Sequence, residues 1–100
     1  MLIEAPRYRF TRSMASGSPE EAGVYGLWNG EELVFVGRAS PGATIRACLI
    51  RHLDGYCACT RHATHYAWEL SLQPAAREAE ILNEFQARFG RPPRCNAEAA

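Results

Sequence analysis

Three segments between residues 23 and 72 have patterns of hydrophobic and polar residues that are typical of β-strands. The segments "GVYGLW" and "ELVFVG" are rich in β-branched and aromatic residues, and "THYAWELSL" places Tyr66, Trp68 and Leu70 on one face. Asn29-Gly30 separates the first two segments, and this dipeptide favours a type I′ turn because both residues tolerate positive φ. The pattern therefore predicts an antiparallel hairpin and a third strand.

Two other segments have apolar residues at helical spacing. In "RASPGATIRACLIRHLDG", Ser40 can cap a helix, Pro41 can occupy its first position, and Gly55 can end it. The second helix starts at Pro74 and ends at Gly90. Its apolar stripe consists of Ile81, Leu82, Phe85 and Phe89. The predicted fold class is α/β (α+β): a small three-stranded, mostly antiparallel sheet flanked by helices, in the order β-β-α-β-α.

The remaining segments are expected to be less regular. Residues 1–20 form an N-terminal arm or an edge strand through "RYRF", followed by the turn-rich connector "SMASGSPEEAG". The segment "YCACTRHATHY" has no clear period and is predicted to be a loop. Residues 21–100 are expected to form the compact domain.

Length and composition limit the class of protein. A chain of 100 residues makes one domain, and no apolar run approaches the roughly 18 to 20 residues of a membrane-spanning helix. The start, "MLIEAPRYRF", shows no secretory signal, so a cytoplasmic protein without a membrane partner is expected. The net charge is zero, and all eleven basic residues are arginine, which a GC-rich coding bias explains more simply than selection for phosphate binding.

The four cysteines allow two interpretations. In a cytoplasmic protein they are expected to be thiols rather than disulfides. Cys57 and Cys59 lie close to His52, His62 and His65, which is compatible with a zinc site. The spacing disfavours zinc, because one residue separates the two cysteines where structural zinc sites use two or more. A small zinc-binding adaptor is therefore the weakest of the three functional hypotheses; the other two follow below.

One combination of motifs carries more information than any single motif. Gly23-Val24-Tyr25 is followed ten residues later by Phe35-Val36-Gly37, then by a helix bearing Arg46, a glutamate on the next helix and the closing "PPRCN". This arrangement resembles the GIY-YIG nuclease domain over about residues 21–96. That family includes homing endonucleases, some restriction enzymes and the incision domain of bacterial nucleotide excision repair. Its β-β-α-β-α order agrees with the pattern.

The resemblance implies a set of catalytic residues. Tyr25 matches the first motif tyrosine, which lies near the attacking water, whereas Phe35 replaces the second and has no hydroxyl. Arg46 would grip the phosphate, and Asn96 would support the site. His52 is six residues past Arg46 instead of the family's four.

This spacing leaves three explanations open for the first helix. Cys48 occupies the position four residues before His52. Either the helix register is irregular, or His52 has another role, or Arg51 contributes to the phosphate grip.

The resemblance also implies that a glutamate holds the single Mg²⁺ or Mn²⁺ ion. The candidates are Glu78, Glu80 and Glu84. Glu78 is followed by apolar residues at three, four and seven positions, which matches the family pattern and places its carboxylate beside the buried stripe. Counting back from Asn96 without gaps favours Glu84 instead.

The expected function is a stand-alone, bacterial-type, metal-dependent endonuclease acting on DNA, with a protein partner for targeting. Arg38, Arg51 and Arg94 would contact the nucleic-acid backbone. The alternative is a nucleic-acid-binding or partner-binding module that keeps the scaffold without turnover, for which Phe35 and the displaced His52 are the evidence. The sequence leaves the oligomeric state open.

Overall fold

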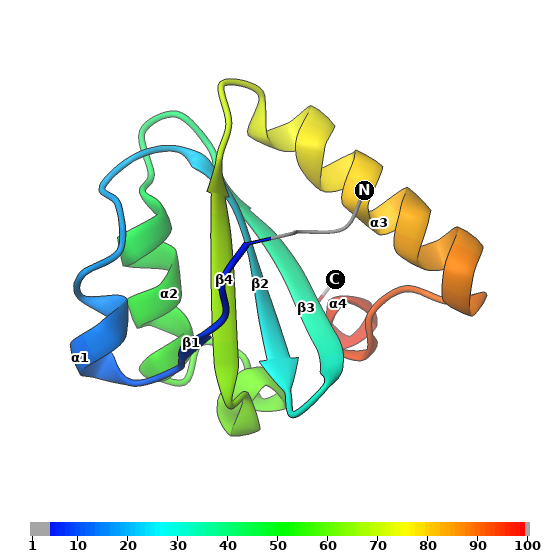
Figure 1. The fold of residues 1–100 in the computed structure, drawn as a ribbon, viewed down its shortest axis with the longest axis horizontal. Coiled ribbons are helices and arrows are strands. Elements are labelled where there is room, and N and C mark those ends of the chain that lie inside the picture. The colour runs from blue at the N-terminus through cyan, green and yellow to red at the C-terminus, as the bar shows by residue number, and fades with distance from the viewer. Residues whose placement is uncertain (1–4, 100) are drawn as a thin grey trace.

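A computed structural model describes residues 5–99 and shows a four-stranded antiparallel sheet in the order β1-β4-β2-β3 (Figure 1). The strands are β1 (Tyr8–Arg9), β2 (Gly23–Asn29), β3 (Glu32–Ala39) and β4 (His65–Leu70). The three predicted strands are present, but the predicted strand count is too low. Tyr8 and Arg9 pair with Tyr66 and His65, so the fourth strand lies within "RYRF", the segment expected to be an arm or an edge strand.

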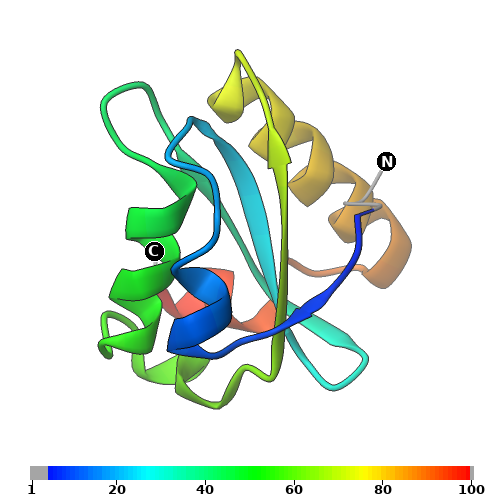
Figure 2. The same ribbon diagram turned by 60° about the vertical axis from the view of Figure 1, so that its left-hand side comes forward.

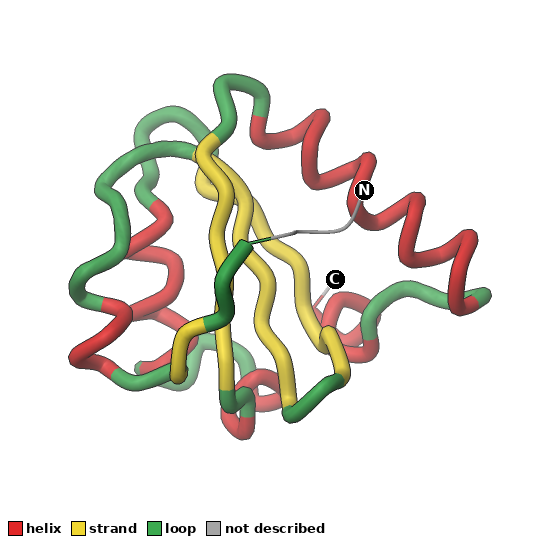
Figure 3. The backbone as a smooth tube through the Cα atoms, in the orientation of Figure 1, coloured by secondary structure: helices red, strands yellow, loops and turns green. Residues whose placement is uncertain are grey.

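Helices cover both faces of the sheet. They are α1 (Arg12–Ala15), α2 (Ile45–Leu53), α3 (Pro74–Phe89) and α4 (Arg94–Ala99), with a 3-10 helix η1 at Ala58–His62. Figures 1 and 2 show α1 and α2 on one face and α3 on the other. Figure 3 shows α4 as a short helix beside β3. None of the helices in residues 5–99 is long and apolar enough to cross a bilayer.

The helix boundaries correct some predicted caps. The start of α2 is capped by Thr44, whose hydroxyl accepts a hydrogen bond from the Ala47 amide at 3.0 Å, rather than by Ser40. Gly55 follows the end of α2 with φ of 91°, and Gly90 ends α3 with φ of 74°, both as predicted. Helix α1, which Thr11 caps, overlaps the start of the predicted connector.

The β2–β3 hairpin has a different turn from the predicted one. Asn29 pairs with Glu32, so the central turn residues are Gly30 and Glu31. Of these two residues, only Gly30 has a positive φ, at 62°. Within residues 5–99, no residue other than glycine has a positive φ. This is the pattern of a type II′ turn, which needs positive φ at the first central position only.

A β-bulge interrupts the pairing of β3 with β2. Leu27 pairs with Phe35, but its neighbour Trp28 pairs with Leu33, so Val34 is an extra residue. Leu33 packs with the cluster under α3, whereas Val34 and Phe35 pack with the cluster under α2. The bulge therefore turns Phe35 toward the α2 face.

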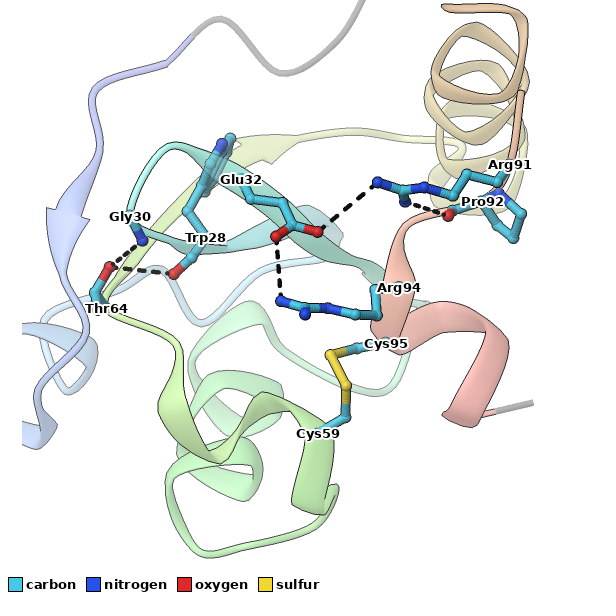
Figure 4. Close-up of polar contacts among 9 residues, drawn as sticks. All are labelled: Trp28, Gly30, Glu32, Cys59, Thr64, Arg91, Pro92, Arg94 and Cys95. Atoms are coloured by element: carbon cyan, nitrogen blue, oxygen red, sulfur yellow. Dashed lines mark hydrogen bonds and ion pairs between the residues drawn. A yellow bond between two sulfur atoms is a disulfide. The ribbon is translucent and has the colours of Figure 1, made fainter. Parts of the chain in front are cut away.

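A disulfide joins η1 to α4 through Cys59 and Cys95, which lie 36 residues apart in the chain (Figure 4). The prediction that all cysteines are thiols is wrong for this pair. Tertiary folding brings the two elements together, and their Cα atoms lie 5.5 Å apart. Cys48 and Cys57 are free thiols.

Candidate active site

A cavity of about 340 Å³ opens between α2, the α3 N-terminal half and the ends of β2 and β3. Its lining residues are Tyr25, Phe35, Gly37, Arg38, Cys48, Arg51, His52, Tyr56 and Glu78. They include two phenols, two guanidinium groups, an imidazole, a thiol and a carboxylate. Of the residues predicted to be functional, the cavity therefore brings together Tyr25, Arg38, Arg51, His52 and Glu78.

Tyr25 is positioned by its neighbour across the hairpin. It pairs with Gly37, and a Cβ atom added at Gly37 would lie 2.5 Å from Cζ and Oη of Tyr25. The tyrosine ring therefore lies against a position where no other residue type fits without displacing it. Gly37 therefore has a steric role, because its lack of a side chain leaves room for the Tyr25 ring.

The hydroxyl of Tyr25 takes part in a buried polar network. It lies 3.1 Å from Nε2 of His52, and Nδ1 of His52 lies 2.9 Å from the hydroxyl of Thr60. Burial raises the pKa of the Tyr25 phenol far above its ordinary range, and the nearby Cys48 adds to this effect. Burial and the Arg51 cation lower the pKa of His52 to about 4. Both groups are therefore neutral at physiological pH.

Phe35 packs against this network without a hydrogen bond of its own. Its ring centroid lies 4.8 Å from that of His52 and 6.1 Å from that of Tyr25. The phenyl ring occupies the predicted place beside Tyr25 and fixes the imidazole by contact. It supplies no hydroxyl, so the hydroxyl groups that line the cavity are those of Tyr25 and Tyr56.

Helix α2 turns Arg51 toward the cavity and Arg46 away from it. Arg46 donates from Nε to the Ser18 carbonyl at 2.9 Å and pairs with Glu20. This corrects the expectation that Arg46 faces the site. Residues three and four apart share a helix face, so Cys48, Arg51 and His52 lie together, and Arg46 lies on another side.

The thiol of Cys48 occupies the cavity position four residues before His52, where the resemblance leads one to expect the phosphate-gripping arginine. Burial raises the pKa of this thiol. The thiol is therefore neutral, and unlike an arginine it supplies no positive charge at this position. The cations that line the cavity are Arg38 and Arg51.

Glu78 is the candidate glutamate that faces the cavity. Its carboxylate accepts a hydrogen bond from Arg38 at 3.1 Å, and Arg38 is half-exposed. Glu80 instead pairs with Arg77 outside the cavity. Glu84 is not among the lining residues. The apolar pattern on α3 therefore selected the glutamate that the fold brings to Tyr25.

Asn96 lies beside the site and holds its strand. Its side-chain amide donates to the Val36 carbonyl and accepts from the Val36 amide, both at 2.8 Å. Because β3 is an edge strand, these bonds satisfy backbone groups that would otherwise face outward. Val36 lies between Phe35 and Gly37, so Asn96 fixes the backbone of two lining residues.

Arg94 lies away from the cavity, at the hairpin end of the sheet. It pairs with Glu32 at 3.1 Å, and Arg91 approaches the same carboxylate (Figure 4). The predicted contact of Arg94 with nucleic acid stays a prediction, and the structure places this residue outside the site.

Sequence reasoning missed two residues that contact His52, one of which, Tyr56, also lines the cavity. The Tyr56 ring lies edge-on to His52 at 5.3 Å and beneath the Arg51 guanidinium at 4.3 Å. Thr60, in η1, is fully buried against His52. Both lie in the segment predicted to be a loop, where no periodicity marked them.

The donor set of the cavity suits a magnesium ion better than a zinc ion. Within residues 5–97, no three side chains of His, Cys, Asp or Glu are grouped as metal ligands. Cys59 is bonded to Cys95, which removes it from the zinc site that was considered. Magnesium retains several waters and needs only one or two protein carboxylates, which the single carboxylate of Glu78 can satisfy.

Comparison with solved structures identifies the fold. The structure resembles the magnesium-bound GIY-YIG N-terminal endonuclease domain of UvrC from Thermotoga maritima, with a TM-score of 0.64 over 75% of this chain and 89% of that chain, at 18% identity. A tyrosine-to-phenylalanine mutant of the same domain, bound to its catalytic divalent cation, matches with a TM-score of 0.63 at 20% identity and the same coverage. The predicted GIY-YIG fold is confirmed.

Two further mutants of that domain, each with another tyrosine replaced by phenylalanine, are also bound to the divalent cation and match with a TM-score of 0.63. By sequence alone, no family model and no curated protein matches this chain. The likeness therefore rests on three-dimensional structure.

Proposed function

We propose that this protein is a divalent-metal-dependent endonuclease that hydrolyses phosphodiester bonds of DNA. The observation that carries the proposal is the convergence of Tyr25, Arg51 and Glu78 in one cavity, from three elements of the fold. Such a reaction needs an oriented water, cations for the phosphate and a metal ligand. The UvrC domain with this fold supports the assignment, because it is an endonuclease domain bound to magnesium.

The arginine residues of the cavity would hold the substrate phosphate. Arg51 is placed by its stacking on Tyr56, at 4.3 Å from the ring centroid. Arg38 would leave Glu78 and take a phosphate oxygen when DNA binds, which its half-exposed position permits. This proposal transfers the phosphate grip from Arg46 to Arg51.

Glu78 would hold the Mg²⁺ or Mn²⁺ ion once Arg38 has moved. The bound ion would neutralise negative charge on the phosphoryl oxygens. Retention of the cation by phenylalanine mutants of the UvrC domain supports metal binding in a site that carries Phe35. Tyr25 would orient the attacking water, and Asn96 would keep β3 in place.

A second candidate function is a binding module without turnover. Two observations favour it: Cys48 supplies no charge at the position where an arginine was expected, and Phe35 supplies no hydroxyl. Such a module would use Arg38 and Arg51 to bind the backbone. Its partner, DNA or a protein, would bind over the same cavity.

One experiment separates these functions. Plasmid, single-stranded DNA and RNA are incubated with the protein, with and without Mg²⁺ or Mn²⁺. We expect metal-dependent cleavage of DNA that Glu78→Gln reduces by a factor of about a thousand or more, because one electrostatic contact in a transition state accounts for about 10² to 10³ and metal loss exceeds it. Cleavage is followed on gels.

Two matched controls accompany this measurement: Glu80→Gln for Glu78→Gln, and Arg46→Met for Arg51→Met. Glu80→Gln lies on the same helix outside the cavity and should cleave as the wild type does. Arg51→Met should lose activity, and Arg46→Met should retain it. Binding of DNA without cleavage under every metal condition would establish the binding module instead.

A further inference from the structure

Thr60 forms a buried contact whose direction is fixed by chemistry. Its hydroxyl oxygen lies 3.0 Å from the carbonyl oxygen of Cys57 and 2.9 Å from Nδ1 of His52. A carbonyl oxygen has no hydrogen to donate, so the hydroxyl hydrogen of Thr60 lies on the contact with Cys57. If the hydroxyl hydrogen pointed to Nδ1 of His52 instead, lone pairs of the Thr60 hydroxyl oxygen and the Cys57 carbonyl oxygen would face each other in a fully buried place.

The direction of this bond determines the tautomer of His52. Since the Thr60 hydroxyl has used its hydrogen, Nδ1 must donate to the Thr60 oxygen. His52 is neutral because its pKa is lowered to about 4, and a neutral imidazole carries one hydrogen. Nε2 therefore presents a lone pair, and the Tyr25 hydroxyl at 3.1 Å donates to it. The phenol oxygen is left with lone pairs that can accept a hydrogen bond from water.

The position of Thr60 is held by covalent and backbone contacts. It follows Cys59, which is bonded to Cys95 of α4, and its amide donates to the Cys57 carbonyl at 3.2 Å. The side chain is therefore fixed relative to both η1 and the sheet edge that Asn96 supports.

We propose that Thr60 is a positioning residue that keeps His52 in the Nδ1–H tautomer, so that His52 accepts the phenolic proton of Tyr25 as Tyr25 takes a proton from the attacking water. This step rests on the proposed nuclease function. A water O–H bond breaks, and its proton bonds to the phenol oxygen. The phenolic proton bonds to Nε2. The hydroxide oxygen bonds to phosphorus, the bond to the leaving oxygen breaks, and that oxygen takes a proton from solvent. His52 then releases the proton on Nε2 to solvent, which restores the neutral imidazole.

The tautomer is measured directly by nuclear magnetic resonance of the ¹⁵N-labelled protein near neutral pH, with His52→Gln used to assign the His52 signals. We expect a hydrogen on Nδ1 and none on Nε2 in the wild type and in Thr60→Ser. Thr60→Val has the same shape without the hydroxyl, and we expect it to lose the single tautomer. A hydrogen on Nε2 in the wild type, or an unchanged tautomer in folded Thr60→Val, would overturn the proposal.

Cleavage kinetics give the second readout. We expect Thr60→Val to lower kcat about tenfold with KM unchanged, since loss of an outer hydrogen-bond partner of a histidine costs on that order, and Thr60→Ser to restore it. Equal kcat in Thr60→Val and wild type would overturn the positioning role. A wild type that cleaves nothing would refute the nuclease function and the proton transfer, while the tautomer measurement would still decide what Thr60 does. If Thr60→Val fails to fold, the wild-type tautomer decides.

Discussion

The same two strands build two different faces. Toward α3, β2 and β3 contribute to a wholly apolar cluster of buried side chains. Its members are Val24, Trp28, Leu33, Val36, Ala67, Ile81 and Phe85. Toward α2, the strands contribute Tyr25 and Phe35 to a cluster that encloses the hydrogen-bonded pair His52 and Thr60.

The difference shows how a domain of 100 residues combines stability with a reactive site. Burying apolar surface stabilises the folded state by about 25 cal/mol per Å². Replacing a hydrogen bond to water with one inside the protein contributes only about 1 kcal/mol net. The buried polar side-chain atoms of residues 5–97 all have partners. The polar face is therefore tolerated without being the main source of stability, and the four predictions that follow test this division.

The largest effect is expected on the apolar face. Phe85→Ala should lower the free energy of unfolding by about 3 to 5 kcal/mol, because the buried ring leaves a cavity. Urea denaturation measures it. Phe89 lies on the same helix in contact with Phe85 but is 55% exposed, so Phe89→Ala should cost much less. Equal losses would contradict the packing of α3.

The disulfide is expected to have the next largest effect. Cys59→Ser combined with Cys95→Ser should lower stability by about 2 to 4 kcal/mol, because the unfolded chain is no longer constrained across 36 residues. Wild type in reductant should unfold at the same urea concentration as the double variant. Cys57→Ser serves as the control, since Cys57 is free. Thiol titration yielding four free cysteines in the unreduced native protein would contradict the bond.

Stability should also depend on pH through His52. The folded pKa of about 4 lies below the ordinary value of 6.5, so the unfolded chain binds more protons between these pH values. This contribution is fully present above about pH 6.5 and is lost as the pH falls to about 4, by about 3 kcal/mol. The difference between wild type and His52→Gln isolates it in urea titrations. Parallel pH curves for both proteins would contradict it.

The smallest effect is expected when one methyl group is added to a glycine on either face. Gly37→Ala should cost about 1 to 3 kcal/mol and displace the Tyr25 ring, with loss of any cleavage activity. Gly26→Ala is the matched change on the apolar face, where a Cβ would meet Leu33 and Trp28 side chains at 3.1 Å. It should reduce stability without altering activity per folded molecule. Equal activity in the two variants would contradict the packing of Tyr25 on Gly37.

Periodicity in the sequence predicted most of the fold. The helix from Pro74 to Gly90 and the three longer strands have patterns long enough to reveal which side is buried. The same reasoning chose Glu78 among three glutamates, and the structure places Glu78 in the cavity. The short helices α1 and η1 escaped prediction because they contain less than two periods of any pattern, whereas β1 lies in the segment expected to be an arm or an edge strand.

Residue types in the sequence determined that this protein has two amphipathic helices and a hairpin of β2 and β3 that carries a phenol at Tyr25. Tertiary structure alone decided which chemistry meets that phenol. The bulge at Val34 moves Phe35 to the side of Tyr25, whereas strict alternation from Leu33 would place it opposite. The faces of α2 select Arg51 over Arg46, and long-range packing brings Thr60 to His52. Such contacts depend on register and on chain segments far apart in sequence, which local patterns do not encode.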